Sequence, residues 1–260
     1  MEHSPVIETG ILPATRNLVH TYLMLGANTP GAKVQEETGM WLCTGTMEHP
    51  ICNFAVDIEP SNEVAARIRE LALQRKAFCV YLLPPFDGSE HFATLEKQGF
   101  LLSHRLKMLV ADEVAEDRIE LEEVQIPKDR RKLAEFMVDQ FFHRLPTAFR
   151  RGIAEATAAP GTLKLYRAVW NERTAGAVMV SEHESVVGIY NLCVAPHFRN
   201  RGWGSSIVRT IVESASKRGC GVTLQCEASL ASWYASLGFR EVGSVSVFGL
   251  YRGKEIDIMS

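Results

Sequence analysis

The chain lacks several features that would mark a membrane, secreted or metal-binding protein. No apolar run approaches the length that spans a bilayer, and the first four residues lack the basic start of a signal peptide. The six cysteines form no Cys-x-x-Cys pair, and the eight histidines form no His-x-x-x-His pair or His/Cys cluster. We therefore expect reduced thiols, a cytoplasmic protein and no bound metal.

The chain also carries little net charge, with a formal value of -3 at pH 7. A balance this small gives no reason to expect a nucleic-acid partner. The hydrophobic content of 46% over 260 residues is enough for one large domain or two ordinary ones with a sizeable core. The sequence leaves the oligomeric state open.

The most informative segment is a strand, a glycine turn and a helix around residues 194–205. The apolar, β-branched stretch 186–194 predicts a buried strand, and apolar residues at helical spacing follow the turn: Ile207, Val208, Ile211, Val212 and Ala215. The first N–H groups of a helix have no intrahelical partner and carry the positive end of the helix dipole. With Gly202 and Gly204 removing side chains there, the turn is suited to a pyrophosphate.

The spacing of this turn differs from two familiar phosphate loops, because no lysine precedes Ser205 and Ile207 stands where a third glycine would belong. It resembles the Arg/Gln-x-x-Gly-x-Gly/Ala acyl-CoA loop of the GNAT superfamily (GCN5-related N-acetyltransferases). Arg199, Gly202 and Gly204 occupy the three marked positions. Taken alone, the pattern also fits an ordinary turn between a strand and a helix.

A second match follows at the expected distance. The short apolar strand 221–226 precedes a helix over 228–237, which Gly238 ends. The segment from Tyr234 to Phe239 resembles the Tyr-x-x-x-Gly-Phe signature of the same family. The resemblance spans roughly residues 118–252 and implies acetyl-CoA as cosubstrate.

The order of expected elements is also that of a GNAT domain. A strand within 118–124 precedes a helix that starts at Pro127, a helix over 146–158 and a hairpin of strands 163–170 and 175–181. The strand, loop, helix, strand and helix described above come next, followed by a final strand. The fold class is therefore α/β (α+β), a mixed and mostly antiparallel sheet flanked by helices. The resemblance implies that the central strands of the C-terminal domain splay apart.

The first half of the chain resembles a degenerate repeat of the second. Residues 95–100 parallel 234–239 at an offset of 139, and residues 53–56 parallel 191–194 at an offset of 138. Chance similarity between short α/β segments is the alternative. We infer two tandem GNAT-like domains, with residues 1–113 as the first and 114–260 as the catalytic second, joined by a charged linker near 112–117.

The first copy has lost the residues that carry the chemistry. Ser61, Val64 and Ala66 stand where the loop arginine and its two glycines stand, and Leu95 stands where the signature tyrosine stands. We therefore expect this domain to be degenerate, without the CoA phosphate loop. Its expected role is to pack against the second domain and to form one side of the substrate channel.

The resemblance implies a role for each residue of the second domain that matches the family pattern. Tyr234 would act as the general acid that protonates the departing thiolate. The implied cofactor-binding residues are Cys193 and Val194, whose backbone would pair with pantetheine, and Arg199, Asn200, Arg201, Gly202, Trp203, Gly204 and Ser205 around the pyrophosphate. Trp203 is expected to pack rather than to stack on adenine. The implied reaction is direct attack of a primary amine on acetyl-CoA.

The general base is left open, because Gly188 stands where many family members carry a carboxylate. Glu184 and Glu227 are candidates, as is Glu182 close to Glu184, and deprotonation through water is an alternative. Two other functions also fit: a non-catalytic module that binds CoA, and an acyltransferase that uses a longer acyl-CoA. The acceptor, a small-molecule or peptide amine, cannot be named from the sequence.

Overall fold

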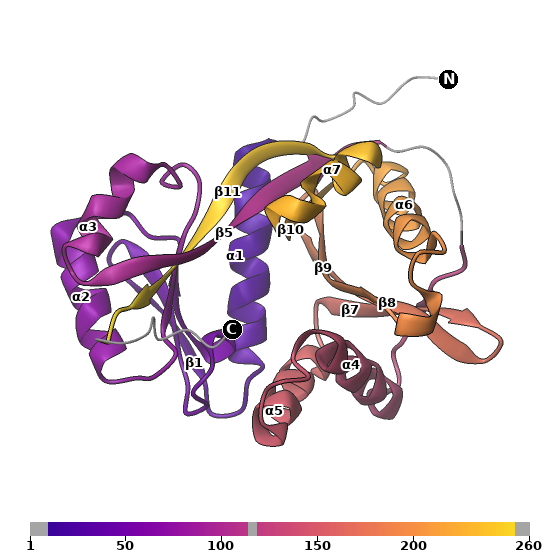
Figure 1. Ribbon diagram of the computed structural model, residues 1–260, viewed down its shortest axis with the longest axis horizontal. Helices are drawn as coiled ribbons and strands as arrows, with labels where there is room; N and C mark the ends of the chain where they lie inside the picture. Colours follow the sequence, from indigo (N-terminus) through magenta and orange to yellow (C-terminus); the bar gives the residue numbers. More distant parts are fainter. Residues whose placement is uncertain (1–9, 114–118, 253–260) are drawn as a thin grey trace.

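The computed structural model describes residues 10–113 and 119–252. Within these ranges the strands form one mixed sheet of 11 strands in the order β1-β2-β3-β4-β11-β5-β10-β9-β8-β7-β6 (Figure 1). The expected linker lies partly outside the described residues, and so does Arg118, the expected start of the first strand of the second half. The predicted fold class is confirmed.

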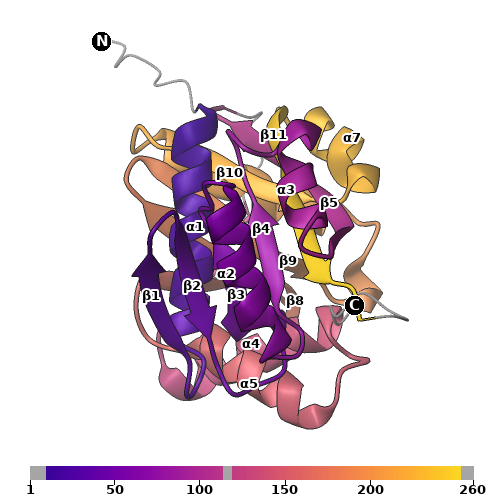
Figure 2. The same cartoon turned by 90° about the vertical axis from the view of Figure 1, so that its left-hand side faces the viewer.

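Over residues 10–113, the first half contains three α-helices and five strands. Their bounds are α1 (Ile11–Ala27), β1 (Lys33–Glu37), β2 (Met40–Thr44), β3 (Asn53–Val56), α2 (Asn62–Leu73), β4 (Cys79–Leu82), α3 (Phe92–Glu96) and β5 (Phe100–Ala111), with short 3-10 turns η1 (Pro50–Cys52) and η2 (Ser89–His91). This half faces the viewer in Figure 2. The sequence analysis made no prediction for α1.

The second half follows the predicted order of elements. Its bounds are β6 (Glu122–Glu123), α4 (Pro127–Phe141), α5 (Thr147–Ala158), β7 (Leu163–Trp170), β8 (Arg173–His183), β9 (Val186–Val194), η3 (Pro196–Phe198), α6 (Trp203–Ser216), β10 (Gly221–Cys226), α7 (Ala228–Ser236) and β11 (Arg240–Leu250). Pro127 occupies the first turn of α4, where its missing N–H costs nothing. Glycine in the left-handed region precedes the last strand of each half, at Gly99 and Gly238.

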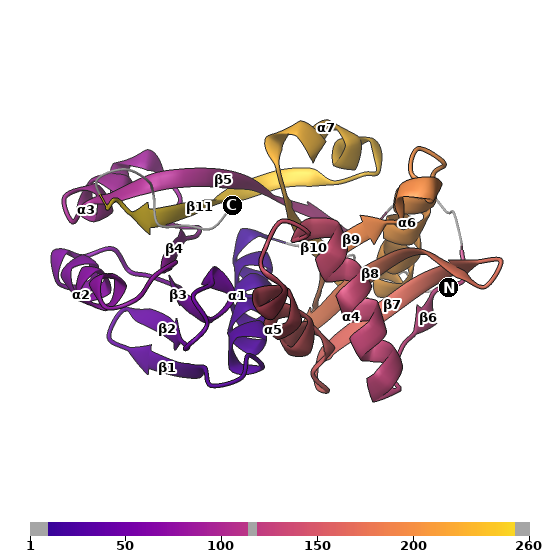
Figure 3. The same cartoon turned by 60° about the horizontal axis from the view of Figure 1, so that its bottom comes forward.

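The last strands of the two halves cross into each other's part of the sheet. β11 pairs with β4 of the first half, and β5 pairs with β10 of the second. β5 and β11 also pair with each other, antiparallel, from Phe100 opposite Leu250 to Val110 opposite Arg240, and Figure 3 shows them running side by side. The division after residue 113 remains a prediction about the chain, but the sheet continues through it.

Helices cover both faces of this sheet. On one face, α6 and α7 pack on the second half, and α2 and α3 on the first. On the opposite face, α4 and α5 pack on the second half, and α1 packs near the middle (Figure 1). None of the described helices has the length and apolar character needed to cross a bilayer. All six cysteines are free.

A buried asparagine on α1 connects the two halves. Asn17 has no exposed surface, and its Nδ2 donates to the carbonyl oxygens of Ser181 and Val186, both at 3.0 Å. Its Oδ1 accepts a hydrogen bond of 2.8 Å from the Tyr190 hydroxyl. A Cβ built at Gly188 would overlap both Asn17 Oδ1 and the Tyr190 ring. The glycine is therefore what allows α1 to lie against β9.

Replacing Asn17 with alanine is expected to reduce the free energy of unfolding by about 2–4 kcal/mol, because three hydrogen bonds are lost and their partners stay buried. Asn28→Ala, at the residue that caps the C-terminal end of the same helix, is the control. It removes a single longer bond, 3.4 Å to the Ala156 carbonyl, and should cost less than about 1 kcal/mol. Urea denaturation of both variants measures the difference, and equal losses would contradict the assignment.

Candidate active site

The parallel strands β9 and β10 separate before either one ends. They pair from Val186 opposite Gly221 only as far as Ile189 opposite Leu224. Beyond that point the register of β9 with β8 shifts, and Asn191 has a φ of 49°. A bulge of this kind bends a strand away from its neighbour. The predicted splay of the central strands is confirmed, and it opens a gap beside the last residues of β9.

The loop at the end of β9 presents free helix amides to the surface. Asn200 and Gly202 both adopt left-handed conformations, and α6 begins at Trp203 with no side-chain cap. The first i to i−4 hydrogen bond runs from Ser206 N–H to the Gly202 carbonyl, at 3.0 Å. The N–H groups of the three preceding residues, 203–205, therefore take no part in the i to i−4 hydrogen bonds of the helix. A Cβ at Gly202 would meet nothing within 4 Å, so the space beside this glycine is open.

The matching helix of the first half starts with a side-chain cap. Ser61 caps α2, and its Oγ accepts a hydrogen bond of 3.1 Å from the Val64 N–H. This hydroxyl takes up an amide that α6 leaves free. The contrast gives a physical reason for the predicted loss of the phosphate loop in the first half.

The two arginines of the loop have different surroundings. Arg199 Nε donates to the Val194 carbonyl at 3.1 Å, and its Nη2 donates to Gln140 Oε1 at 3.0 Å. This side chain therefore ties the loop to β9 and α4. Arg201 is exposed. Charge beside an anion in the loop therefore comes from Arg201 as well as from the tethered guanidinium of Arg199.

Aromatic side chains surround the loop. The Trp203 ring lies 6.0 Å from Trp170 and 6.0 Å from Phe198, both in edge contacts. A Cβ at Gly204 would lie 3.6 Å from the Trp233 ring, which is ordinary contact. Trp203 thus packs against neighbouring rings of its own chain, and Gly204 tolerates little more than a methyl group.

Tyr234 lies on α7, on the same face of the sheet as α6. It is 6% exposed and packs against Trp233 and Phe239, with ring centroids 4.5 Å and 5.6 Å away. It shares its core cluster with Cys226, the last residue of β10. Burial, helped by Cys226, raises the pKa of Tyr234 well above its ordinary value. The phenol therefore holds its proton at neutral pH, as an acid requires.

Two of the candidate carboxylates lie at different ends of the sheet. Glu184 is in the turn before β9, at the end opposite the loop, and it pairs with Arg16 at 3.2 Å. The structure therefore does not bring Glu184 to the gap. Glu227 follows β10 directly, precedes α7 and is exposed. It lies at the end of the gap, but it is not among the residues that line the pocket described next.

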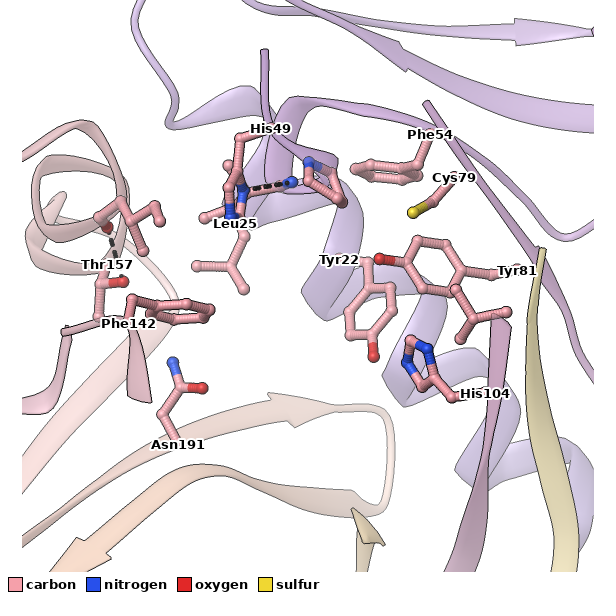
Figure 4. A pocket seen from close by; sticks show the side chains of 14 residues that line it. Tyr22, Leu25, His49, Phe54, Cys79, Tyr81, His104, Phe142, Thr157 and Asn191 are labelled. Carbon is pink, nitrogen blue, oxygen red and sulfur yellow. Dashed lines mark hydrogen bonds between the residues drawn. The ribbon is translucent and has the colours of Figure 1, made fainter. Parts of the chain in front are cut away.

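A pocket of about 240 Å³ lies between the two halves, where the freed end of β9 faces the first half. In Figure 4, Asn191 and Phe142 lie on one side of this space, Tyr81 and His104 on the other, and Tyr22 between them. Its lining consists of Tyr22, Leu25, His49, Pro50, Ile51, Phe54, Cys79, Tyr81, His104, Phe142, Ile153, Thr157, Asn191 and Val247. Most of these residues come from the first half, which supports its predicted role as a wall.

The pocket is electrically neutral. None of its lining residues is Asp, Glu, Lys or Arg. Burial lowers the pKa of His49 to about 4 and raises the pKa of Tyr22 to about 12. Burial also lowers the pKa of His104, against the opposing charge of Glu227. These groups are therefore uncharged at pH 7. Sequence reasoning missed the pocket, because its residues come from many separate elements and match no motif.

Comparison with known proteins agrees with this geometry. Residues 162–241 match the family model of the acetyltransferase (GNAT) domain. No curated protein matches the chain. Among the described residues there is no group of three or more side chains suited to hold a metal ion.

Several solved structures resemble nearly the whole chain. A GCN5-related N-acetyltransferase from Kribbella flavida has a TM-score of 0.66 and 11% identity, over 94% of this chain and 97% of that one. A GNAT-family protein from Novosphingobium aromaticivorans has a TM-score of 0.57 and 17% identity, over 89% and 96%.

A tandem GNAT protein from the clavulanic acid biosynthesis pathway has a TM-score of 0.57 and 15% identity, over 91% of this chain and 94% of that one. At such identities the likeness concerns the fold. Residues 162–241 thus match the acetyltransferase (GNAT) domain, within a chain that has the tandem GNAT fold.

Proposed function

We propose that this protein is an N-acetyltransferase that moves an acetyl group from acetyl-CoA to a primary amine. The observation that carries the proposal is the opening between β9 and β10, with a cradle of free amides at its surface end and a neutral pocket beside it. A diphosphate at the amides and a thioester in the gap would place the acyl carbon next to the pocket. The GNAT domain match supports transferase activity.

The donor would be held chiefly by backbone groups. Cys193 and Val194 pair with β8 on one side only, because β10 no longer runs beside them. Their free edge can hydrogen-bond to the amide groups of a pantetheine arm, much as an added strand would. The Val194 carbonyl already accepts from Arg199, so one of its two lone pairs is in use.

In the proposed reaction the amine nitrogen attacks the thioester carbonyl directly, and the C–S bond breaks. Tyr234 gives its proton to the departing thiolate. Its ring lies in the same core cluster as Cys226 at the end of β10, which supports this role. Holding donor and amine together supplies much of the rate, so no covalent enzyme intermediate is needed. The free cysteines agree with the reducing cytoplasm that we propose as the compartment.

Replacing Gly202 with valine should abolish stabilisation by CoA. The matched control is Gly219→Val at the other end of α6. Both glycines have positive φ, 84° and 70°, and both have nothing within 4 Å of a Cβ. Each variant should lose roughly 1–2 kcal/mol of stability through backbone strain. At about a hundred times its dissociation constant, CoA should stabilise the wild type and Gly219→Val by roughly 2.7 kcal/mol, and Gly202→Val hardly at all. Thermal melts with and without CoA measure this, and equal shifts in both variants would contradict the loop assignment.

Replacing Tyr234 with phenylalanine should lower kcat by about 100-fold or more, because the ring still fills its core site but the thiolate loses its acid. Tyr166→Phe is the control, since its hydroxyl donates to Glu123 at 3.3 Å on β6, away from the gap. Release of free CoA thiol from acetyl-CoA with an active amine gives the rates. An unchanged kcat in Tyr234→Phe would show that the thiolate takes its proton from elsewhere.

A further inference from the structure

We propose that His104 is the catalytic base of this reaction. We also propose that the acceptor is a primary amine attached to an apolar group about the size of one aromatic ring, which binds in the pocket between the halves. This proposal rests on the proposed function and names its acceptor class and its missing base. Four observations carry it: the position of His104, the shape of the opposite wall, the chemistry of the lining and the poorer placement of the other candidate groups.

His104 lies on the part of β5 that extends past the end of β10. β10 ends at Cys226, opposite Lys107, so the part of β5 that holds His104 has no β10 strand beside it. His104 stands opposite Val247 of β11, which stands opposite Tyr81 of β4. These three side chains form a cross-strand row that lines the pocket. The exchanged strand β5 therefore positions the imidazole of His104, a residue of the first half, at the end of the gap between β9 and β10 in the second half.

The opposite wall of the pocket is the bulge of β9. Asn191 lies just past the last residue that pairs with β10, and it lines the pocket. Figure 4 shows Asn191 and His104 on opposite sides of the same space, with Tyr22 between them. A thioester that passes through the gap would therefore emerge between the bulge and the imidazole. An amine in the pocket would have His104 on the side away from the donor.

The lining selects against strongly charged acceptors. Tyr22, Phe54 and Tyr81 pack edge to face, with centroids 4.9 to 6.4 Å apart. Phe142 and Ile153 extend this apolar surface on the other side. A polycation would find no carboxylate among the lining residues, whereas a single ammonium can lie against the aromatic faces before it loses its proton. The pocket volume of about 240 Å³ is below the range typical of pockets that bind drug-sized ligands, so the pocket suits one ring with a short amine arm.

The other candidate groups are less well placed than His104, and Glu227 does not line the pocket. A carboxylate at position 188 would collide with Asn17, and Glu184 is paired to Arg16 at the far end of β9. His49 also lines the pocket, but it is buried, and its Nδ1 accepts a hydrogen bond of 3.1 Å from the Ile51 N–H. With a pKa of about 4, His49 is a weak base. His104 is exposed at the pocket edge, and its Nδ1 lies 3.3 Å from Ser103 Oγ.

The bound ammonium first releases one proton to solvent. As the neutral nitrogen attacks the acyl carbon, a second proton passes to Nε2 of His104, and the thiolate takes the proton of Tyr234. Solvent then carries the proton from the imidazolium back to the phenolate, giving an amide and free CoA thiol. The titratable groups that line the pocket with His104 are Tyr81 and Cys79 on β4, Tyr22 on α1 and His49 before η1, and Glu227 before α7 acts on His104 through its charge. Of these, Glu227 is the one charged at pH 7, and it stabilises the imidazolium.

The test compares His104→Gln with His91→Gln, a histidine of η2 outside the pocket and the loop. The donor is acetyl-CoA, and the acceptors are 2-phenylethylamine, glycinamide and spermidine. Wild type and His91→Gln should prefer 2-phenylethylamine by at least tenfold in kcat/KM. His104→Gln should lose 100-fold or more in kcat/KM with that amine. Because a base must be neutral, the wild-type rate should fall as the pH drops through the pKa of His104, below 6.5. In His104→Gln this fall should vanish.

The outcomes separate the inference from the function on which it rests. Acetyl transfer that favours spermidine, or an acid limb that persists in His104→Gln, would overturn the inference and leave the acetyltransferase intact. A faster reaction with longer acyl donors, with no inhibition by excess 2-phenylethylamine, would show that the pocket holds the acyl chain. Failure of CoA to stabilise the wild type, with no turnover of any amine, would instead contradict the proposed function. Equal melting temperatures of the two glutamine variants confirm that folding is unaffected.

Discussion

The contact between Asn17 and the turn end of β8 and β9 is the interaction on which the arrangement of the two halves depends. One buried amide satisfies two strand carbonyls and a tyrosine hydroxyl, which together fix the position of α1 across the sheet. Buried polar groups of this kind cost stability unless every partner is in place. The contact therefore specifies one placement of α1, and α1 in turn supplies Tyr22 and Leu25 to the pocket wall.

This placement has a chemical consequence for the second half. By occupying the space next to Gly188, α1 excludes a carboxylate from the strand position where related domains often carry one. In the proposed reaction a protein base would then come from another element. The exchanged strand β5 could supply it, because β5 runs along the side of β10 and past its end. The lack of space at position 188 and the pocket wall from the first half both follow from the placement of α1.

Much of this fold could be predicted from local sequence. Alternating and helical apolar periods located the elements of the second half, and Pro127 and Gly238 marked a helix start and a helix end. The repeat was visible because Gly-Phe pairs precede both last strands. The exchange of β5 and β11 could not be predicted, since both strands satisfy the same pattern in either position. The pocket was equally hidden, because Tyr22, His49 and His104 lie far apart in sequence and each looks like an isolated residue.

The two halves have diverged at one kind of position, the amides at the start of the helix after the parallel strand. In the first half a serine hydroxyl occupies an amide of α2, and in the second a left-handed glycine leaves the amides of α6 uncovered. A capped helix start stabilises its own half, whereas an uncovered one leaves its amides to water or to a bound anion. This difference agrees with a packing role for the first half and with the binding role proposed for the second. Because residues of both halves line the pocket, the proposed acceptor site depends on both.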